Sequence, residues 1–147
     1  MYDQIVVPTD GSEGMGRVVE HAASLARVHE ASLDLVYVVN TATFANLPME
    51  TSWEGVRQSL REEGEAALEA AEEVAGGVPT ARHTLEGGPS REIVAYAERT
   101  GADLVLMGTH GRGGINRILI GSVAERVVRT STVPVLTVRV GEEGVMG

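Results

Sequence analysis

The sequence contains no cysteine and no lysine, and aromatic residues make up only 3% of its 147 residues. The absence of cysteine excludes disulfide scaffolds, thiol catalysis and cysteine-based zinc sites. All 12 basic residues are arginines, so a phosphate-binding loop of the Gly-Lys-Ser/Thr type is excluded as well. With so few aromatic rings, the core must be built from Val, Leu, Ile and Ala.

Positive charge is scarce, because 21 acidic residues against 12 arginines give a net charge of −9. Non-specific nucleic-acid binding depends on basic side chains that neutralise phosphates, so we expect no nucleic-acid partner. Long apolar runs are also missing: the first run, Ile5 to Val7, is too short for a signal peptide. No run approaches the ~20 residues of a membrane helix. We therefore expect a soluble, cytoplasmic protein with no membrane partner.

Two kinds of apolar pattern alternate along the chain. Short, continuously apolar runs predict strands, and segments with apolar residues at helical spacing predict helices. Strands that are apolar throughout favour a parallel sheet covered by helices on both faces. We expect one α/β domain over residues 1–140, followed by a flexible C-terminal tail over 141–147. The predicted strands are residues 4–8, 33–39, 81–85, 103–107 and 133–140, and the predicted helices are residues 12–30, 53–75, 89–99 and 122–129. Ser12 is expected to cap the first helix, and Val123, Val127 and Val128 are expected to point inward from the last.

Two strand ends carry an unusual composition. Residues 8–12, Pro-Thr-Asp-Gly-Ser, follow the first strand, and a glycine-rich stretch from Gly108 to Gly121 follows the fourth. Ligands of open parallel sheets bind beyond the carboxyl ends of the strands. Glycines let a ligand approach backbone N–H groups, and the predicted helix that starts at Ser122 offers further donors for phosphate. These glycines could also serve only as turn formers, but five of them at one strand-to-helix junction favour a phosphate site.

Three separated segments resemble the universal stress protein family. Gly108-x-x-Gly111, nine residues and then Gly121-Ser122 is similar to the G-2x-G-9x-G(S/T) signature of its ATP-binding members. Residues 5–12 resemble the family's first strand and turn, and residues 131–139 resemble its last strand. The resemblance implies an open five-stranded parallel sheet in the order 3-2-1-4-5, a Rossmann-like three-layer sandwich with helices on both faces.

The resemblance also implies a site for ATP, with Mg²⁺ or Mn²⁺ bridging the phosphates. It places the nucleotide against residues from the first, second and fourth strands and from the glycine-rich segment. The adenosine half would contact Pro8, Thr9, Asp10, Val38, Met107 and Gly108, and the phosphates would contact Gly111, Arg112, Gly113, Gly121, Ser122 and Val123.

A homodimer is implied too, with the last strands, between Val133 and Val140, paired across a two-fold axis. An apolar edge strand needs covering, although a neighbouring loop could cover it instead. The function we expect is that of an ATP-binding stress-response regulator with the nucleotide as a switch and at most slow hydrolysis. The alternatives are a slow adenine-nucleotide hydrolase and an interaction module that binds no nucleotide.

Several other features leave two interpretations open. Asp10 could contact a ligand or cap its own turn, and His110, within the glycine-rich loop, could contact phosphate or take a modest catalytic role. Residues 40–53 form a long connection that suits either a lid or plain packing. His21, His29 and His83 lack partners at metal-ligand spacing and are expected to be surface or packing residues.

Overall fold

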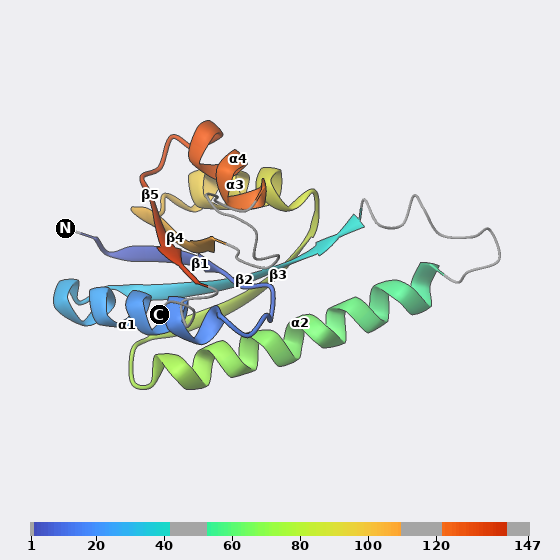
Figure 1. The fold of residues 1–147 in the computed structure, drawn as a ribbon, viewed down its shortest axis with the longest axis horizontal. Helices are drawn as coiled ribbons and strands as arrows, with labels where there is room; N and C mark the ends of the chain where they lie inside the picture. Colours follow the sequence, from blue (N-terminus) through green and yellow to red (C-terminus); the bar gives the residue numbers. More distant parts are fainter. Residues whose placement is uncertain (1, 42–52, 110–121, 141–147) are drawn as a thin grey trace, which may run out of the picture.

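The computed structural model describes residues 2–41, 53–109 and 122–140. Within these ranges, strands and helices alternate along the chain (Figure 1). The elements are β1 (Gln4–Pro8), α1 (Met15–His29), β2 (Ser32–Asn40), α2 (Trp53–Ala75), β3 (Thr80–Gly87), α3 (Pro89–Thr100), β4 (Leu104–Thr109), α4 (Ser122–Thr130) and β5 (Val135–Arg139).

The strands form one parallel sheet in the order β3-β2-β1-β4-β5, which confirms the predicted fold. β1 lies at the centre, where Val7 pairs with Leu35 of β2 and Val6 pairs with Val105 of β4. The chain therefore winds outward first through β2 and β3, and then in the other direction through β4 and β5. The winding reverses between β1 and β4, which is the place where ligands bind in sheets of this kind.

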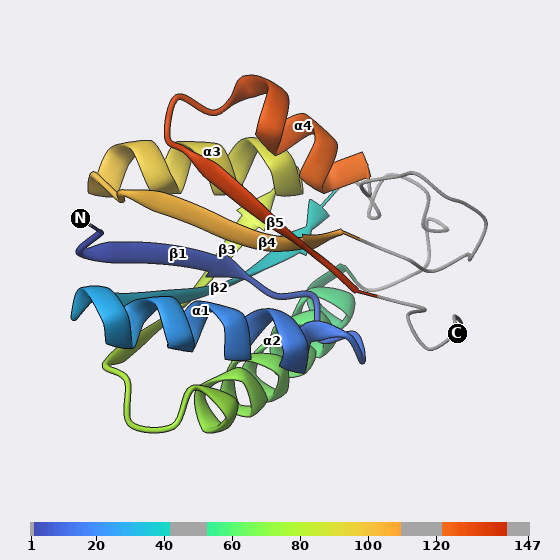
Figure 2. The ribbon, with the colours of Figure 1, turned by 60° about the vertical axis from the view of Figure 1, so that its left-hand side comes forward.

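Helices cover both faces of the sheet. Figure 2 shows α1 and α2 on one side of the strands and α3 and α4 on the other. Side chains alternate along each strand, so neighbouring residues of β1 enter different cores: Ile5 and Val7 pack with α1 and α2, and Val6 packs with α3 and α4. All three are fully buried. Burial on both faces explains why the strands are apolar throughout.

The start of α1 differs from the prediction. We expected Ser12 to cap this helix, but α1 begins at Met15 after Gly14, which makes no side-chain cap. Ser12 instead belongs to the preceding turn, where its N–H donates to Asp10 Oδ1 at 2.9 Å. Ser12 is thereby held in the turn, and only its carbonyl reaches the helix, accepting from Met15 N–H at 3.1 Å.

The buried face of α4 was also predicted incorrectly. We expected Val123, Val127 and Val128 to point inward, but Ala124 and Val127 are the buried pair, Val123 is half-buried, and Val128 is 47% exposed. Positions three residues apart share one face of a helix, and Val128 lies beside that face. None of the helices in the described ranges combines the length and the apolarity that a membrane crossing requires. The predicted tail, residues 141–147, and residues 42–52 of the predicted connection lie outside the described residues.

Candidate functional site

A cavity of about 340 Å³ opens at the carboxyl ends of β1, β2 and β4, where the winding of the sheet reverses. Its size is within the range of small-molecule sites. The turn after β1, the last residues of β2 and β4, and the first turns of α3 and α4 all contribute to it. Its walls are largely aliphatic, and the polar side chains of Thr9, Asp10, Ser12, Asn40 and Ser122 lie among them.

The turn after β1 is held in shape by its own side chains. The Thr9 N–H donates to the Val36 carbonyl at 2.8 Å, so the turn starts as a continuation of the sheet. The Gly11 N–H then donates to Thr9 Oγ1 at 3.2 Å, and the Ser12 N–H donates to Asp10 Oδ1 at 2.9 Å. Gly11 has a φ of 78°, which favours glycine. This turn therefore presents its polar groups in a fixed arrangement.

Eight of the residues predicted from the sequence line this one cavity. They come from four elements and the β1 turn: Pro8, Thr9, Asp10, Val38, Met107, Gly108, Ser122 and Val123. The other four predicted residues, Gly111, Arg112, Gly113 and Gly121, lie outside the described residues, as does His110. Asp10 caps its own turn, as one interpretation predicted. It also lines the cavity, and its contact with a ligand stays a prediction.

Sequence reasoning missed several lining residues. Two of them could have been found from the sequence. Val36 and Asn40 lie two residues before and after Val38 on β2, so all three share one face of the strand. Pro89 and Ile93 enter from the start of α3, and Met15 enters from the start of α1. Ser12, Tyr37, Thr109, Ala124 and Val140 complete the set. Val140 could not be assigned from local pattern, because it reaches the cavity only through the placement of β5 beside β4.

Tyr37 lines both this cavity and a second hollow of about 530 Å³ on the α1 and α2 side, and Thr9, Asp10, Ser12 and Met15 also line both. Burial raises the pKa of the Tyr37 phenol above its usual value of 10, and the negative charges of Glu63 and Asp10 raise it further. The phenol therefore stays protonated at neutral pH and can donate a hydrogen bond. Among the described residues, no group of three or more His, Asp or Glu side chains is placed to hold a metal ion.

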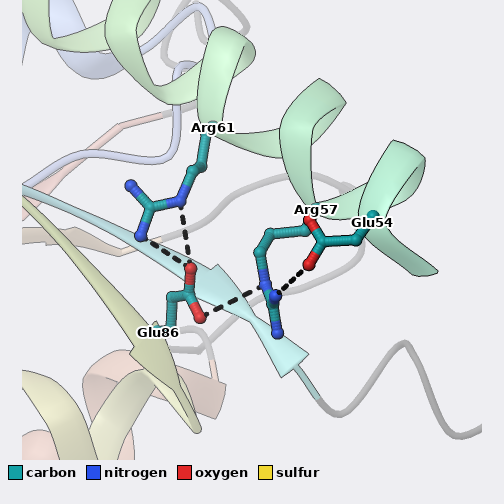
Figure 3. A network of polar contacts seen from close by, with 4 residues as sticks. All are labelled: Glu54, Arg57, Arg61 and Glu86. Carbon is teal, nitrogen blue, oxygen red and sulfur yellow. Dashed lines mark hydrogen bonds and ion pairs between the residues drawn. The ribbon is translucent and has the colours of Figure 1, made fainter.

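An ion-pair network fixes α2 over the end of β3, next to the end of β2 (Figure 3). Arg61 donates to Glu86 Oε2 from Nε at 3.0 Å and from Nη2 at 2.7 Å. Arg57 Nε lies 3.5 Å from Glu86 Oε1, and its Nη1 donates to Glu54 Oε2 at 2.9 Å. Glu86 pairs with Val39 in the sheet. The network thus joins α2 to the strand edge that lies just before Asn40 and the cavity.

Comparison with known proteins agrees with this geometry. The model of the universal stress protein family matches residues 1–139. Universal stress protein MJ0531 of Methanocaldococcus jannaschii is 44% identical over 141 residues, which cover 95% of this chain and 83% of the relative. The solved structure of MJ0577, from the same organism, superposes with a TM-score of 0.81 at 30% identity, over 97% of this chain and 99% of the other.

A second solved structure, a universal stress protein in complex with cAMP, superposes with a TM-score of 0.68 at 27% identity, over 94% and 97% of the two chains. The family match extends over nearly the whole chain and agrees with the fold, the strand order and the motifs. This chain belongs to the universal stress protein family.

Proposed function

We propose that the cavity at the ends of β1, β2 and β4 binds an adenine nucleotide, with ATP as the physiological ligand, and that the protein is a homodimeric, cytoplasmic stress-response regulator whose nucleotide acts as a switch. The observation that carries this proposal is that eight residues expected to contact ATP line a single cavity. A related protein was solved in complex with cAMP, which is also an adenine nucleotide.

The walls of the cavity suit the parts of such a ligand. Val38 and Met107 offer the aliphatic surface that a purine ring packs against. Asp10 can accept from a ribose hydroxyl in addition to the Ser12 N–H, because a carboxylate accepts several hydrogen bonds. At the far side, α4 begins at Ser122, and the N-terminal end of a helix favours negatively charged phosphate.

A divalent cation fits this site as a companion of the phosphates. Mg²⁺ is usually held by one or two carboxylates together with the phosphates of the substrate, and the cavity offers Asp10 with the hydroxyls of Ser12 and Ser122. When bound, Mg²⁺ or Mn²⁺ would neutralise phosphate charge.

We expect hydrolysis of ATP to be slow at most. Among the described lining residues, Asp10 is the one carboxylate, and its Oδ1 is held by the Ser12 N–H. A general base needs a position from which it can take a proton from water. Asp10 already serves the turn, the ribose and the divalent cation in this proposal.

The dimer would form through the edge strand β5, in the segment between Val133 and Val140. Within the described residues β5 pairs with β4 on one side, which leaves its other side available for a second copy. Leu136 and Val138 are half-buried against the α1-side core, so the strand is already held in an extended form.

Charge at Ser122 provides the sharpest test of the nucleotide site. Ser122→Asp keeps a residue that suits a helix start but places a negative charge where phosphates would bind. Ser122→Asn is the matched control, because it has the same size without the charge. By isothermal titration calorimetry with Mg²⁺, we expect Ser122→Asp to weaken ATP binding by about tenfold or more, equivalent to about 1.4 kcal/mol, and Ser122→Asn to change it by less than about threefold.

Adenosine serves as the second probe, since it lacks phosphates. Its affinity should be the same in the two variants. Equal ATP affinity in Ser122→Asp and Ser122→Asn would contradict the assignment of phosphates to α4. If purified protein neither releases nucleotide on denaturation nor binds ATP, the nucleotide function is wrong. Steady release of AMP and pyrophosphate would instead indicate a hydrolase.

A further inference from the structure

Val140 lies at the end of the proposed dimer strand β5 and also lines the proposed nucleotide cavity. It directly follows β5, the edge strand of the sheet, and its half-buried side chain packs against the α1-side core. The same residue also lines the cavity at the ends of β1, β2 and β4. The end of the edge strand is therefore one wall of the ligand cavity.

Two glycines create the space in which Val140 lies. A Cβ on Gly14 would lie 2.9 Å from Val140 Cβ and 3.3 Å from both of its methyl carbons. Gly14 has a φ of −75°, which any residue can adopt, so its backbone does not require glycine. A Cβ on Gly108 would lie 3.6 Å from Val140 Cγ1 and 2.9 Å from Val18 Cγ2. Because Gly14 and Gly108 have no side chains, Val140 can lie between the start of α1 and the end of β4.

The position of Val140 also bears on the strand that precedes it. Residues of β5 pair with β4 up to Thr109 opposite Arg139. Val140 is the next residue, so its side-chain packing anchors the end of the paired segment. A ligand in the cavity would contact Val140 from the open side and hold it against Gly14 and Gly108. The backbone N–H and C=O groups at the end of β5 would then be ordered, and these groups lie on the free edge with which a second copy would pair.

We propose that nucleotide binding and pairing of β5 with a second copy of the chain are thermodynamically linked through Val140, so that nucleotide strengthens the dimer. This inference depends on the proposed function of the cavity. Linkage is reciprocal: a nucleotide that stabilises the dimer must bind the dimer more tightly than the monomer, and the change in the dimer constant is the product of the affinity changes at the two sites of the dimer. Val140 acts here as a positioning residue.

The test measures the dimer dissociation constant by sedimentation equilibrium, with and without saturating ATP and Mg²⁺. For the parent protein, we expect ATP to lower this constant by about tenfold, within the usual range of coupling between sites. Gly14→Ala displaces Val140 and should reduce the effect of ATP to less than about twofold. Gly16→Ala is the matched control, because it also lies at the start of α1 and its Cβ would meet nothing within 4 Å.

Two further variants separate this role from general packing. Val140→Ala leaves the start of α1 intact and should also lose the linkage, and Val140→Ile should retain it. Hydrogen exchange of the amides from Leu136 to Val140 gives a second measurement, taken at concentrations where the parent is monomeric. ATP should slow this exchange in the parent and in Gly16→Ala, but not in Val140→Ala.

The outcomes separate the linkage from the function on which it depends. Calorimetry on the same samples reports whether ATP binds. If ATP binds while the dimer constant and the exchange rates stay unchanged, the linkage is wrong and the nucleotide site stands. A chain that binds ATP but remains monomeric at every concentration also overturns the linkage. If ATP does not bind at all, the proposed function fails together with the inference.

Discussion

The ring of Tyr37 on β2 lies against Gly64 on α2 so closely that a Cβ on Gly64 would come within 2.8 Å of Tyr37 Cε2. Glycine inside a helix costs about 1 kcal/mol relative to alanine, and Gly64 is buried in the middle of the 23-residue α2. The missing side chain makes room for the ring. This contact places Tyr37 where it borders both the ligand cavity and the neighbouring hollow.

We expect Gly64→Ala to destabilise the protein by about 1–2 kcal/mol, because the cost of overpacking exceeds the gain in helix propensity. Gly16→Ala is the control: its Cβ meets open space, so it should raise stability by up to about 1 kcal/mol. Urea unfolding followed by circular dichroism measures both changes. Stabilisation by Gly64→Ala would show that the Tyr37 ring moves aside without cost.

A buried carboxylate lies on the opposite side of the sheet. Asp34 of β2 is 9% exposed and accepts hydrogen bonds from Tyr96 Oη at 3.0 Å and from Gln4 Nε2 at 2.7 Å. Burial raises the pKa of the Tyr96 phenol from 10 to about 12, and the charge and hydrogen bond of Asp34 contribute to the increase. The neutral phenol is thus the form that the folded state favours.

Tyr96→Phe should cost about 1–3 kcal/mol at neutral pH, because it leaves Asp34 with one donor fewer. The folded-state pKa of Tyr96 is higher than the unfolded value, so its contribution is complete below pH 10 and is lost between pH 10 and about 12. The stability difference between parent and variant should therefore narrow over this range. Guanidinium unfolding at several pH values measures the difference, and a constant gap would contradict the prediction.

The pKa of Asp103 is shifted downward, whereas that of Tyr96 is shifted upward. Its Oδ2 accepts from the backbone N–H groups of Asp3 at 2.8 Å and Gln4 at 3.0 Å, and these hydrogen bonds lower the pKa of the carboxyl below 3.8. Its contribution is present above the unfolded pKa and is lost as pH falls through the folded value. Asp103→Asn should cost about 1 kcal/mol or less at neutral pH, because solvent screens this site. In thermal unfolding, the difference in stability between the parent and the variant should shrink as pH falls below 3.8.

The network around Glu86, which is drawn in Figure 3, should contribute little to stability. Arg57, Arg61 and Glu86 keep 37%, 46% and 27% of their side chains exposed. Exposed pairs of this kind contribute roughly 0.2–1 kcal/mol. A double-mutant cycle with Arg61→Gln and Glu86→Gln should give a coupling energy in that range, and it should fall when salt is raised. A salt-independent coupling above about 2 kcal/mol would show that the pair is shielded from solvent.

Local pattern was sufficient for the helices and the strands and for a parallel sheet covered on both faces, whereas the strand order was implied by the family resemblance. The bounds of α2, Trp53–Ala75, follow from its composition and from the two glycines after it, of which Gly76 has a φ of 66°. Gly101, with a φ of 73°, ends α3 in the same way. Such positions are predictable because one residue type satisfies a strong backbone requirement.

Pattern failed where two local requirements competed or where the partner was distant. Ser12 has the chemistry of a helix cap, but it lies in the turn that the Asp10 side chain closes, two residues before Gly14, which precedes α1. Gly14 resembles a simple turn residue, although the space it leaves is filled by Val140, which is far away in the sequence. In the candidate site, the residues at strand ends were predictable from motif, whereas Ile93 and Val140 enter through packing of α3 and β5.

The central position of β1 has a consequence for synthesis of the chain on the ribosome. β1 is made first, and its partner β2 and the outer strand β3 are complete once residue 87 has emerged. The side of β1 that pairs with β4 must wait for residues 104–109. A nascent chain that has folded its first three strands therefore carries an open edge in what becomes the middle of the sheet, and exposed edges are templates for unwanted pairing. Pro8 and Thr9, which line the cavity in the complete fold, lie at the end of β1, whose edge toward β4 is still unpaired at that stage.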